Sequence, residues 1–307
     1  MKMTFHKLVI GASMAIGMSA LATVPAQAGT LTGATIGGTA ADDYYVYDSD
    51  AKNTFKVEKP SANDVQKVLS GNAASPTGNV ELRASSEGKD FDFTKNTTLT
   101  GTIGGKTLTL SSLTSDDWFG VGQKTTKYGS TNLANTWFNQ ALNSYGISDS
   151  TFTLLAKYSY TKESLFDSFL KNGGFERFSD PNISYVNQDD TSGLISIGLA
   201  GHYNAATLIT PSLGLPINLS SLLPSLLQAS EIVKYTYDGK TDYLYSFKAT
   251  ESGLVEKGDT KSHSGNYEVT IKGVVPPAAV PEPSIILGLL GVAGVFVTQR
   301  KFKKVSI

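Results

Sequence analysis

The feature that most constrains the fold is a two-residue loop between two threonine-rich segments. Gly104-Gly105 joins "LTGTI" to "KTLTL", and both segments alternate between apolar and polar side chains. Two glycines in such a loop favour the tight turn of a β-hairpin, whose central residues need positive φ angles. The period of two begins near residue 80, so we expect a sheet over this part of the chain.

Strand signals recur on both sides of a helical section. Residues 44–47 and 54–57 flank an acidic turn, further strands flank a turn near 189–193, and Asp238-Gly239 marks a hairpin between two tyrosine-rich strands. We therefore expect strands near both ends of the folded part of the chain.

The middle of the chain has helical spacing. Ser61 and Thr161 are expected N-caps, and residues 133–142 place their apolar side chains on one helical face. The leucine-rich residues 219–233 contain Pro224 and predict a short helix pair or a kinked helix. The sequence predicts a β-rich α+β fold, a sandwich-like sheet with a helical middle section, and the helices could be an insertion between strands.

The N-terminus has the layout of a signal peptide. Lys2 and Lys7 precede an uncharged run, and Ala26-Gln27-Ala28 has the small-residue pattern that signal peptidase cleaves. We expect cleavage after Ala28, which makes Gly29 the first mature residue. The alternative is an uncleaved membrane anchor.

The C-terminus has the layout of a membrane anchor. Residues 285–297 carry no charge and would span about 20 Å as a helix, so flanking residues must extend the transmembrane helix to about 284–299. Basic residues follow and are expected to stay in the cytoplasm with the body outside. These basic residues are Arg300, Lys301, Lys303 and Lys304.

A short motif stands directly before the apolar run. Pro281-Glu282-Pro283, the run and "RKFKK" together resemble a PEP-CTERM sorting domain, over about residues 279–304. The resemblance implies processing by an exosortase, in bacteria that have an outer membrane and make extracellular polysaccharide. It implies removal of the tail and delivery to the cell surface or extracellular matrix. Permanent anchoring is the alternative.

These segments divide the chain into four parts. We expect a signal peptide at 1–28, an exported body at 29–275, a Pro/Ala linker at 276–280 and a sorting tail at 281–307.

The charge of the body differs from that of the two ends. The segments 1–28 and 281–307 hold six of the 26 Lys and Arg and one of the 27 Asp and Glu, which leaves residues 29–280 with a net charge of −6. An acidic body argues against nucleic-acid binding. The absence of cysteine excludes disulfides and thiolate zinc sites.

No catalytic residue is predicted. The body has two histidines, His202 and His263, without a G-x-S-x-G elbow or an H-E-x-x-H motif. Adjacent aspartates occur at 42–43, 116–117 and 189–190, and glycosidases use carboxyl pairs, but a chain with this many acids offers such pairs by chance.

Two sets of residues could form binding sites, and each set could instead have a purely structural role. An oxygen-rich stretch could hold calcium, or it could be a polar turn beside a strand. Its residues are Asp180, Asn182, Asn187, Asp189 and Asp190. Tyrosines on the expected hairpin could stack on sugars, or they could reflect β-propensity alone. They are Tyr235, Tyr237, Tyr243 and Tyr245.

The expected function is a non-enzymatic surface or matrix protein associated with exopolysaccharide. Its expected partners are signal peptidase, an exosortase, the inner membrane before processing and the polysaccharide. One alternative is a secreted hydrolase acting on glycans, which a convergent, desolvated acid pair in a deep cleft would favour. Another is a self-assembling structural protein.

Overall fold

The computed structural model describes residues 29–86, 88–215 and 223–276. The chain divides into two compact units, Met1–Val275 and Pro276–Ile307, and the first contains the helices and strands described for this protein. The predicted signal peptide, sorting motif and transmembrane helix lie outside the described residues. Within the three described ranges, no helix combines the length and the apolar character that crossing a membrane requires.

The body is β-rich and contains two sheets, so the predicted α+β class is confirmed. The smaller sheet is antiparallel, with the order β1-β5-β6-β9-β10. Its strands are β1 (Thr32–Gly38), β5 (Thr97–Ile103), β6 (Lys106–Ser111), β9 (Val233–Tyr237) and β10 (Lys240–Leu244).

The larger sheet has eight strands in the order β11-β13-β8-β7-β4-β2-β3-β12, antiparallel except for the β3–β12 pair. Its strands are β2 (Tyr44–Ser49), β3 (Asn53–Lys56), β4 (Gly78–Leu82), β7 (Asn182–Gln188), β8 (Leu194–Gly201), β11 (Thr250–Glu251), β12 (Val255–Glu256) and β13 (Gly265–Lys272).

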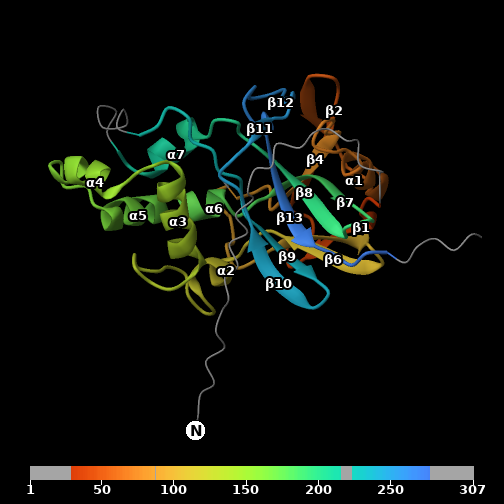
Figure 1. The fold of residues 1–307 in the computed structure, drawn as a ribbon, viewed down its shortest axis with the longest axis horizontal. Coiled ribbons are helices and arrows are strands. Elements are labelled where there is room, and N and C mark those ends of the chain that lie inside the picture. The colour runs from red at the N-terminus through yellow and green to blue at the C-terminus, as the bar shows by residue number, and fades with distance from the viewer. Residues whose placement is uncertain (1–28, 87, 216–222, 277–307) are drawn as a thin grey trace, which may run out of the picture. The chain divides into compact units, whose positions relative to one another are not determined.

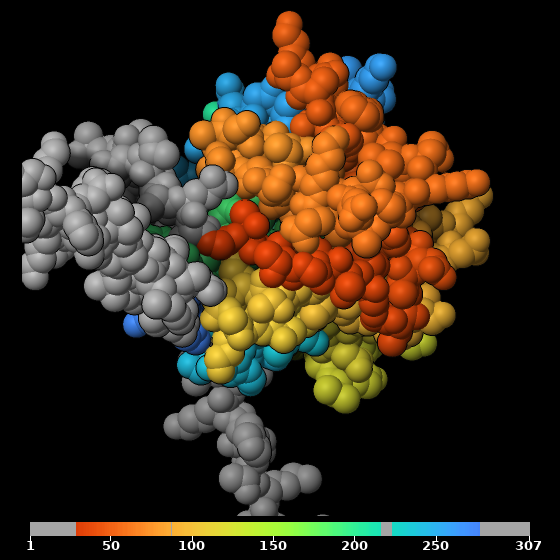
Figure 2. Space-filling view, turned by 90° about the vertical axis from the view of Figure 1, so that its right-hand side faces the viewer, coloured from red at the N-terminus to blue at the C-terminus, as the bar shows by residue number. Residues whose placement is uncertain are grey.

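One hydrophobic core contains side chains from both sheets. Leu99 and Leu110 come from the smaller sheet, Val80 and Ile197 come from the larger one, and all four are fully buried. Helix α1 (Ala62–Val68) adds its apolar face to the same core. Figure 2 shows β1 in red, crossing the surface between the orange segment that includes α1 and the yellow strands β5 and β6.

The remaining helices form a second core beside the sheets. Five of them lie between β6 and β7 in the chain, where the sequence predicted a helical middle section, and α7 follows β8. Figure 1 shows α3 to α7 gathered at one end of the body. Trp118, Trp137 and Phe175 are packed edge to face at its centre. The helices are α2 (Ser115–Phe119), α3 (Leu133–Ser144), α4 (Asp149–Ala156), α5 (Lys162–Lys171), α6 (Gly174–Arg177) and α7 (Ala206–Ser212).

The predicted local signals are confirmed. Gly104 and Gly105 have φ angles of 59° and 74° and close the β5–β6 hairpin. Ser61 and Thr161 cap α1 and α5, each in a capping box. The hairpin at Asp238-Gly239 joins β9 to β10.

The leucine-rich segment differs from its prediction. Residues 216–222 lie outside the described ranges, and residues 223–232 are not helical. Their backbone bonds instead to three other parts of the chain: Leu227 accepts from Ala205, Ser230 donates to Ser246, and Ile232 donates to Phe178. These long-range bonds replace the helical ones that Pro224 would interrupt, and they hold Glu231 at the boundary between the two cores.

The two ends of the body meet at one residue. The Gln188 backbone N–H donates to the Gly29 carbonyl at 2.9 Å, and its side-chain Nε2 donates to the Val274 carbonyl at 2.6 Å. Gln188 is the last residue of β7. Both ends of the body are therefore fixed at the C-terminal end of that strand.

Candidate functional site

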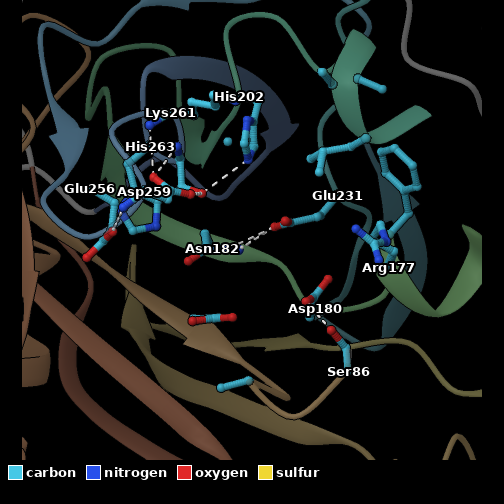
Figure 3. A pocket seen from close by; sticks show the side chains of 18 of the residues that line it. Ser86, Arg177, Asp180, Asn182, His202, Glu231, Glu256, Asp259, Lys261 and His263 are labelled. Carbon is cyan, nitrogen blue, oxygen red and sulfur yellow. Dashed lines mark hydrogen bonds between the residues drawn. The ribbon is translucent and has the colours of Figure 1, made fainter. Parts of the chain in front are cut away.

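A pocket of about 520 Å³ lies at the opposite end of β7, where the larger sheet meets helices α6 and α7. Glu81 on β4 faces Asn182 on β7 directly across the ladder, so both side chains lie on the face of the sheet that turns away from the shared core. Figure 3 shows the polar side chains that enter this pocket. The pocket thus stands on a polar sheet face and is walled by helices and loops.

Glu231 enters the pocket from the extended segment before β9. Its Oε2 accepts two hydrogen bonds from Asn182, one from the backbone N–H and one from Nδ2, both at 3.1 Å. Burial, and then the negative charge of Asp180, raise the pKa of Glu231 well above its usual value. The residue keeps part of its exposed surface, because the pocket opens to solvent. An enclosed carboxyl with a raised pKa is the central chemical feature of this site.

Asp180 lies two residues before Asn182 and lines the same pocket. Only 6% of its surface is exposed. The Ser86 hydroxyl donates a hydrogen bond to its Oδ2, which orients the carboxylate (Figure 3). Asp180 and Glu231 are therefore two carboxyl groups from distant parts of the chain, fixed in one cavity and coupled by charge.

Asn182 has an acceptor that the protein leaves open. The residue is 6% exposed, and its Nδ2 is engaged with Glu231. Its Oδ1 is buried and has no hydrogen-bond partner among the described residues. A buried amide oxygen without a partner is costly, so a bound molecule that donates to it would be stabilised.

The opposite wall carries a hydrogen-bonded loop. The Ser262 hydroxyl donates to Asp259 Oδ2 and lies 3.1 Å from His202 Nε2. Burial acts against ionisation of Asp259, but bonds from Ser262 and from backbone N–H groups outweigh it, and the pKa of Asp259 is lowered. In a serine-nucleophile triad the carboxylate orients the histidine. Here the carboxylate of Asp259 binds the serine hydroxyl.

His263 is buried behind that loop. Its Nδ1 lies 2.7 Å from the Thr54 hydroxyl, and its ring packs edge-on against Tyr47 with centroids 4.7 Å apart. Burial lowers its pKa to about 4, so the imidazole is neutral at pH 7. It supports the pocket wall without adding charge.

Unusual backbone angles cluster at this pocket. Arg83, Thr260 and His263 have φ angles of 61°, 59° and 63°, and each lines the pocket or neighbours a residue that does. Non-glycine residues adopt such angles at a cost, and they are concentrated at functional sites.

The lining is acidic overall, with five carboxyl groups and two basic side chains. The acids are Glu81, Asp180, Glu231, Glu256 and Asp259, and the bases are Arg177 and Lys261. This balance disfavours phosphorylated ligands and suits a neutral molecule with many hydroxyl groups. In the part of the chain that the structure describes, no group of three or more His, Asp or Glu side chains is arranged to hold a metal ion.

The five residues considered for calcium do not come together. Asp180 and Asn182 lie at the pocket end of β7, and Asn187 and Asp189 lie about 20 Å away at its other end. Ligands of one calcium ion must all lie within about 2.6 Å of it. Asp189 closes the β7–β8 turn by accepting from the Thr191 and Ser192 backbone, and Asp190 follows in that turn. At this end of β7, the interpretation of the oxygen-rich stretch as a polar turn beside a strand is correct.

The hairpin tyrosines do not form one flat exposed face. The register pairs Tyr235 with Asp242 and Tyr243 with Lys234, which places Tyr235 and Tyr243 on opposite faces of the smaller sheet. Tyr237 is 4% exposed and belongs to the shared core. The hydroxyls of Tyr243 and Tyr245 donate to Asp117 and Gln140 at 2.9 Å each. These tyrosines hold the smaller sheet against the helical core.

Glu231 was missed by sequence reasoning, and so was its relation to Asp180. Their positions are 51 residues apart in the numbering, and no motif links them. One signal was present: Glu231 is a lone acid in the apolar stretch 222–233.

The adjacent aspartates at 42–43 and 116–117 have structural partners, since Arg83 binds Asp43 and Lys234 binds Asp117.

Comparison with known proteins assigns nothing further: no family model matches the chain, and neither a curated protein nor a solved structure matches it.

Proposed function

We propose that this chain is an exported protein of the bacterial cell surface or extracellular matrix and that it binds exopolysaccharide in the acidic pocket. The observation that carries the pocket assignment is the buried Asn182 Oδ1, which faces no donor among the described residues in a cavity of about 520 Å³. That volume lies within the usual range for small-ligand sites.

The pocket chemistry fits a neutral sugar. Each sugar hydroxyl donates one hydrogen bond and accepts others, so it needs both kinds of partner. Asn182 Oδ1 and the carboxylates supply acceptors, and Arg177 and Lys261 supply donors. A compact pocket with these groups suits a chain end or a branch of the polysaccharide rather than a long stretch of it.

The proposed route to the cell surface uses both ends of the chain. Signal peptidase would cleave after Ala28, the apolar tail would hold the protein in the inner membrane, and an exosortase would recognise Pro281-Glu282-Pro283. Both ends of the body are fixed at Gln188, about 20 Å along β7 from Asn182. The pocket therefore lies at the end of β7 opposite to the one where both ends of the body are fixed.

The binding proposal is tested with the full-length chain purified in mild detergent. The probes are the exopolymer of the producing organism, five neutral polysaccharides (starch, dextran, laminarin, galactomannan and xylan) and polygalacturonate as an anionic comparison. Binding is measured by co-sedimentation and isothermal titration calorimetry. We expect binding to at least one neutral polymer and none to polygalacturonate.

Two matched variants locate the site. Asn182→Ala should weaken binding at least tenfold, because the amide that meets the ligand is lost. Asn187→Ala, at the other end of the same strand, should bind like the wild type. If no probe binds, or if Asn182→Ala binds as well as the wild type, the proposal is contradicted.

A further inference from the structure

We infer that the pocket hydrolyses the glycosidic bond of the polysaccharide that it binds, with Glu231 as the acid and Asp180 as the base. This inference rests on the proposed glycan binding and goes beyond it, because a binding protein needs no proton donor. Figure 3 shows both side chains entering the same cavity, with Asn182 beside Glu231 and Ser86 beside Asp180.

The hydrogen bonds of Glu231 fix the orientation of its carboxyl group. Both donors of Asn182 point to Oε2 at 3.1 Å. Oε1 accepts neither of these bonds, and it is the oxygen to which the proton of the acid is assigned. The raised pKa of Glu231 agrees with this assignment, since burial and the charge of Asp180 both oppose its ionisation.

The other carboxylates of the pocket are engaged in holding its walls. Glu256 accepts hydrogen bonds from the Gly258 and Asp259 backbone, at 2.6 and 2.8 Å. Asp259 accepts from Ser262 and from the backbone of its own loop, and Glu81 accepts from the Tyr47 hydroxyl. Glu231 and Asp180 come from distant parts of the chain and share the cavity, and the raised pKa of Glu231 makes it the member assigned as the acid.

The step balances as a hydrolysis. Glu231 gives its proton to the glycosidic oxygen, the bond from that oxygen to the anomeric carbon breaks, and its electron pair stays on the departing hydroxyl group. A water molecule attacks the anomeric carbon while Asp180 takes a proton from it. Glu231 ends as a carboxylate and Asp180 as an acid, and transfer of one proton through solvent restores both. No oxidant, metal or other reactant is consumed.

The shape of the site favours a glycan over a peptide. Coupled carboxyl groups that share one proton also hydrolyse peptides. A peptide substrate binds extended, usually along a strand edge, whereas this cavity lies on the face of β4 and β7, in the interior of the larger sheet. A sugar chain end needs only a pocket.

The experiment measures binding and cleavage in the same samples. Full-length wild-type protein, Glu231→Gln, Asp180→Asn and Glu176→Gln are incubated with the exopolymer and the five neutral polysaccharides, and new reducing ends are counted from pH 4 to pH 9. Glu176 is the matched control, because it is also a buried carboxyl with a raised pKa but lies outside the pocket lining. Casein is included to detect peptide cleavage through new amino termini.

We expect Glu231→Gln and Asp180→Asn to lose at least 100-fold in the rate of reducing-end release while keeping binding within about threefold. Glu176→Gln should retain its rate within twofold. Wild-type activity should fall as the pH rises through the pKa of Glu231. The infrared band of protonated carboxyl groups at pH 6 should be weaker in Glu231→Gln than in the wild type, and this reading does not depend on activity.

Each other outcome is decisive. Binding without reducing-end release overturns hydrolysis and leaves the binding proposal standing, whereas absence of binding overturns both. Undiminished release by Glu231→Gln overturns the assignment of the acid. New amino termini from casein without reducing ends would assign the pair to peptide hydrolysis. If a substituted protein does not fold, the wild-type pH profile and infrared band still decide, because an ionised Glu231 at pH 6 contradicts the inference.

Discussion

Replacing His263 by asparagine should flatten the pH dependence of the free energy of unfolding between pH 6.5 and pH 4. The imidazole is 5% exposed, and burial lowers its pKa from 6.5 to about 4, with Asp259 opposing and His202 adding to that shift. Asparagine is a suitable replacement because it tolerates the φ angle of 63° at this position.

The sign and the size of the effect follow from the two pKa values. The folded protein binds this proton more weakly than the unfolded chain does. Its contribution to stability is therefore present above pH 6.5 and is lost as the pH falls toward 4. One pKa unit corresponds to 1.36 kcal/mol, so a pKa lowered from 6.5 to about 4 removes about 3 kcal/mol once both states are protonated. Most of this loss is reached by pH 4.5.

Urea unfolding at half-unit pH steps from 7.5 to 4.5 measures this difference. Other titrating groups are common to both proteins and largely cancel in the comparison. Thr54→Val is the control, because it removes the hydroxyl bonded to Nδ1 but keeps the imidazole. Its stability should be lower at every pH, with a curve parallel to the wild type. Parallel curves for His263→Asn and the wild type would refute the reasoning.

Three further predictions concern packing, charge and processing. Gly198→Ala should destabilise the body by about 1–3 kcal/mol in urea unfolding, because its Cβ would lie 2.2 Å from the Tyr185 ring; an unchanged midpoint would contradict this packing. Glu231→Gln should gain stability relative to the wild type as the pH rises from 5 to 8, since only the wild type must ionise a carboxyl whose folded pKa is raised; a constant difference would rule this out. In the producing organism, mass spectrometry should find Gly29 as the first residue and the tail removed, and substitution of Glu282 by alanine should leave the tail attached; tail removal from that variant would show that the motif is not what the protease recognises.

The pocket depends on the segment that carries Glu231 keeping its extended path. Backbone bonds from Ser230 and Ile232 fix this path on both sides of Glu231. The same segment enters β9 of the smaller sheet, while Asn182 begins β7 of the larger one. The carboxyl groups of Glu231 and Asp180 therefore come from segments that enter different sheets. The distance and orientation between the two groups depend on how these sheets pack.

The predictions that held depend on short-range chemistry. Gly104-Gly105 closes a hairpin because two adjacent glycines accept positive φ angles, and Ser61 begins a helix because its hydroxyl reaches an N–H three residues away. Residues 223–232 of the leucine-rich segment are not helical, because backbone partners from distant segments replaced the local ones. Asp180 and Asn182 were grouped with Asp189 by nearness in sequence, whereas an extended strand separates them.

The amino-acid sequence by itself determined the turns, the helix caps, the β-rich character and the composition of both ends, because each depends on residues within a few positions of one another. Only the tertiary structure decided that Glu231 lies with Asp180 and Asn182 in an enclosed acidic pocket. The physical reason is that proton affinity and hydrogen-bond satisfaction depend on burial and on neighbours in space. Those neighbours here come from β4, β7, the segment before β9 and the loop that holds His263, and only the packing of the two sheets and the helices brings them together.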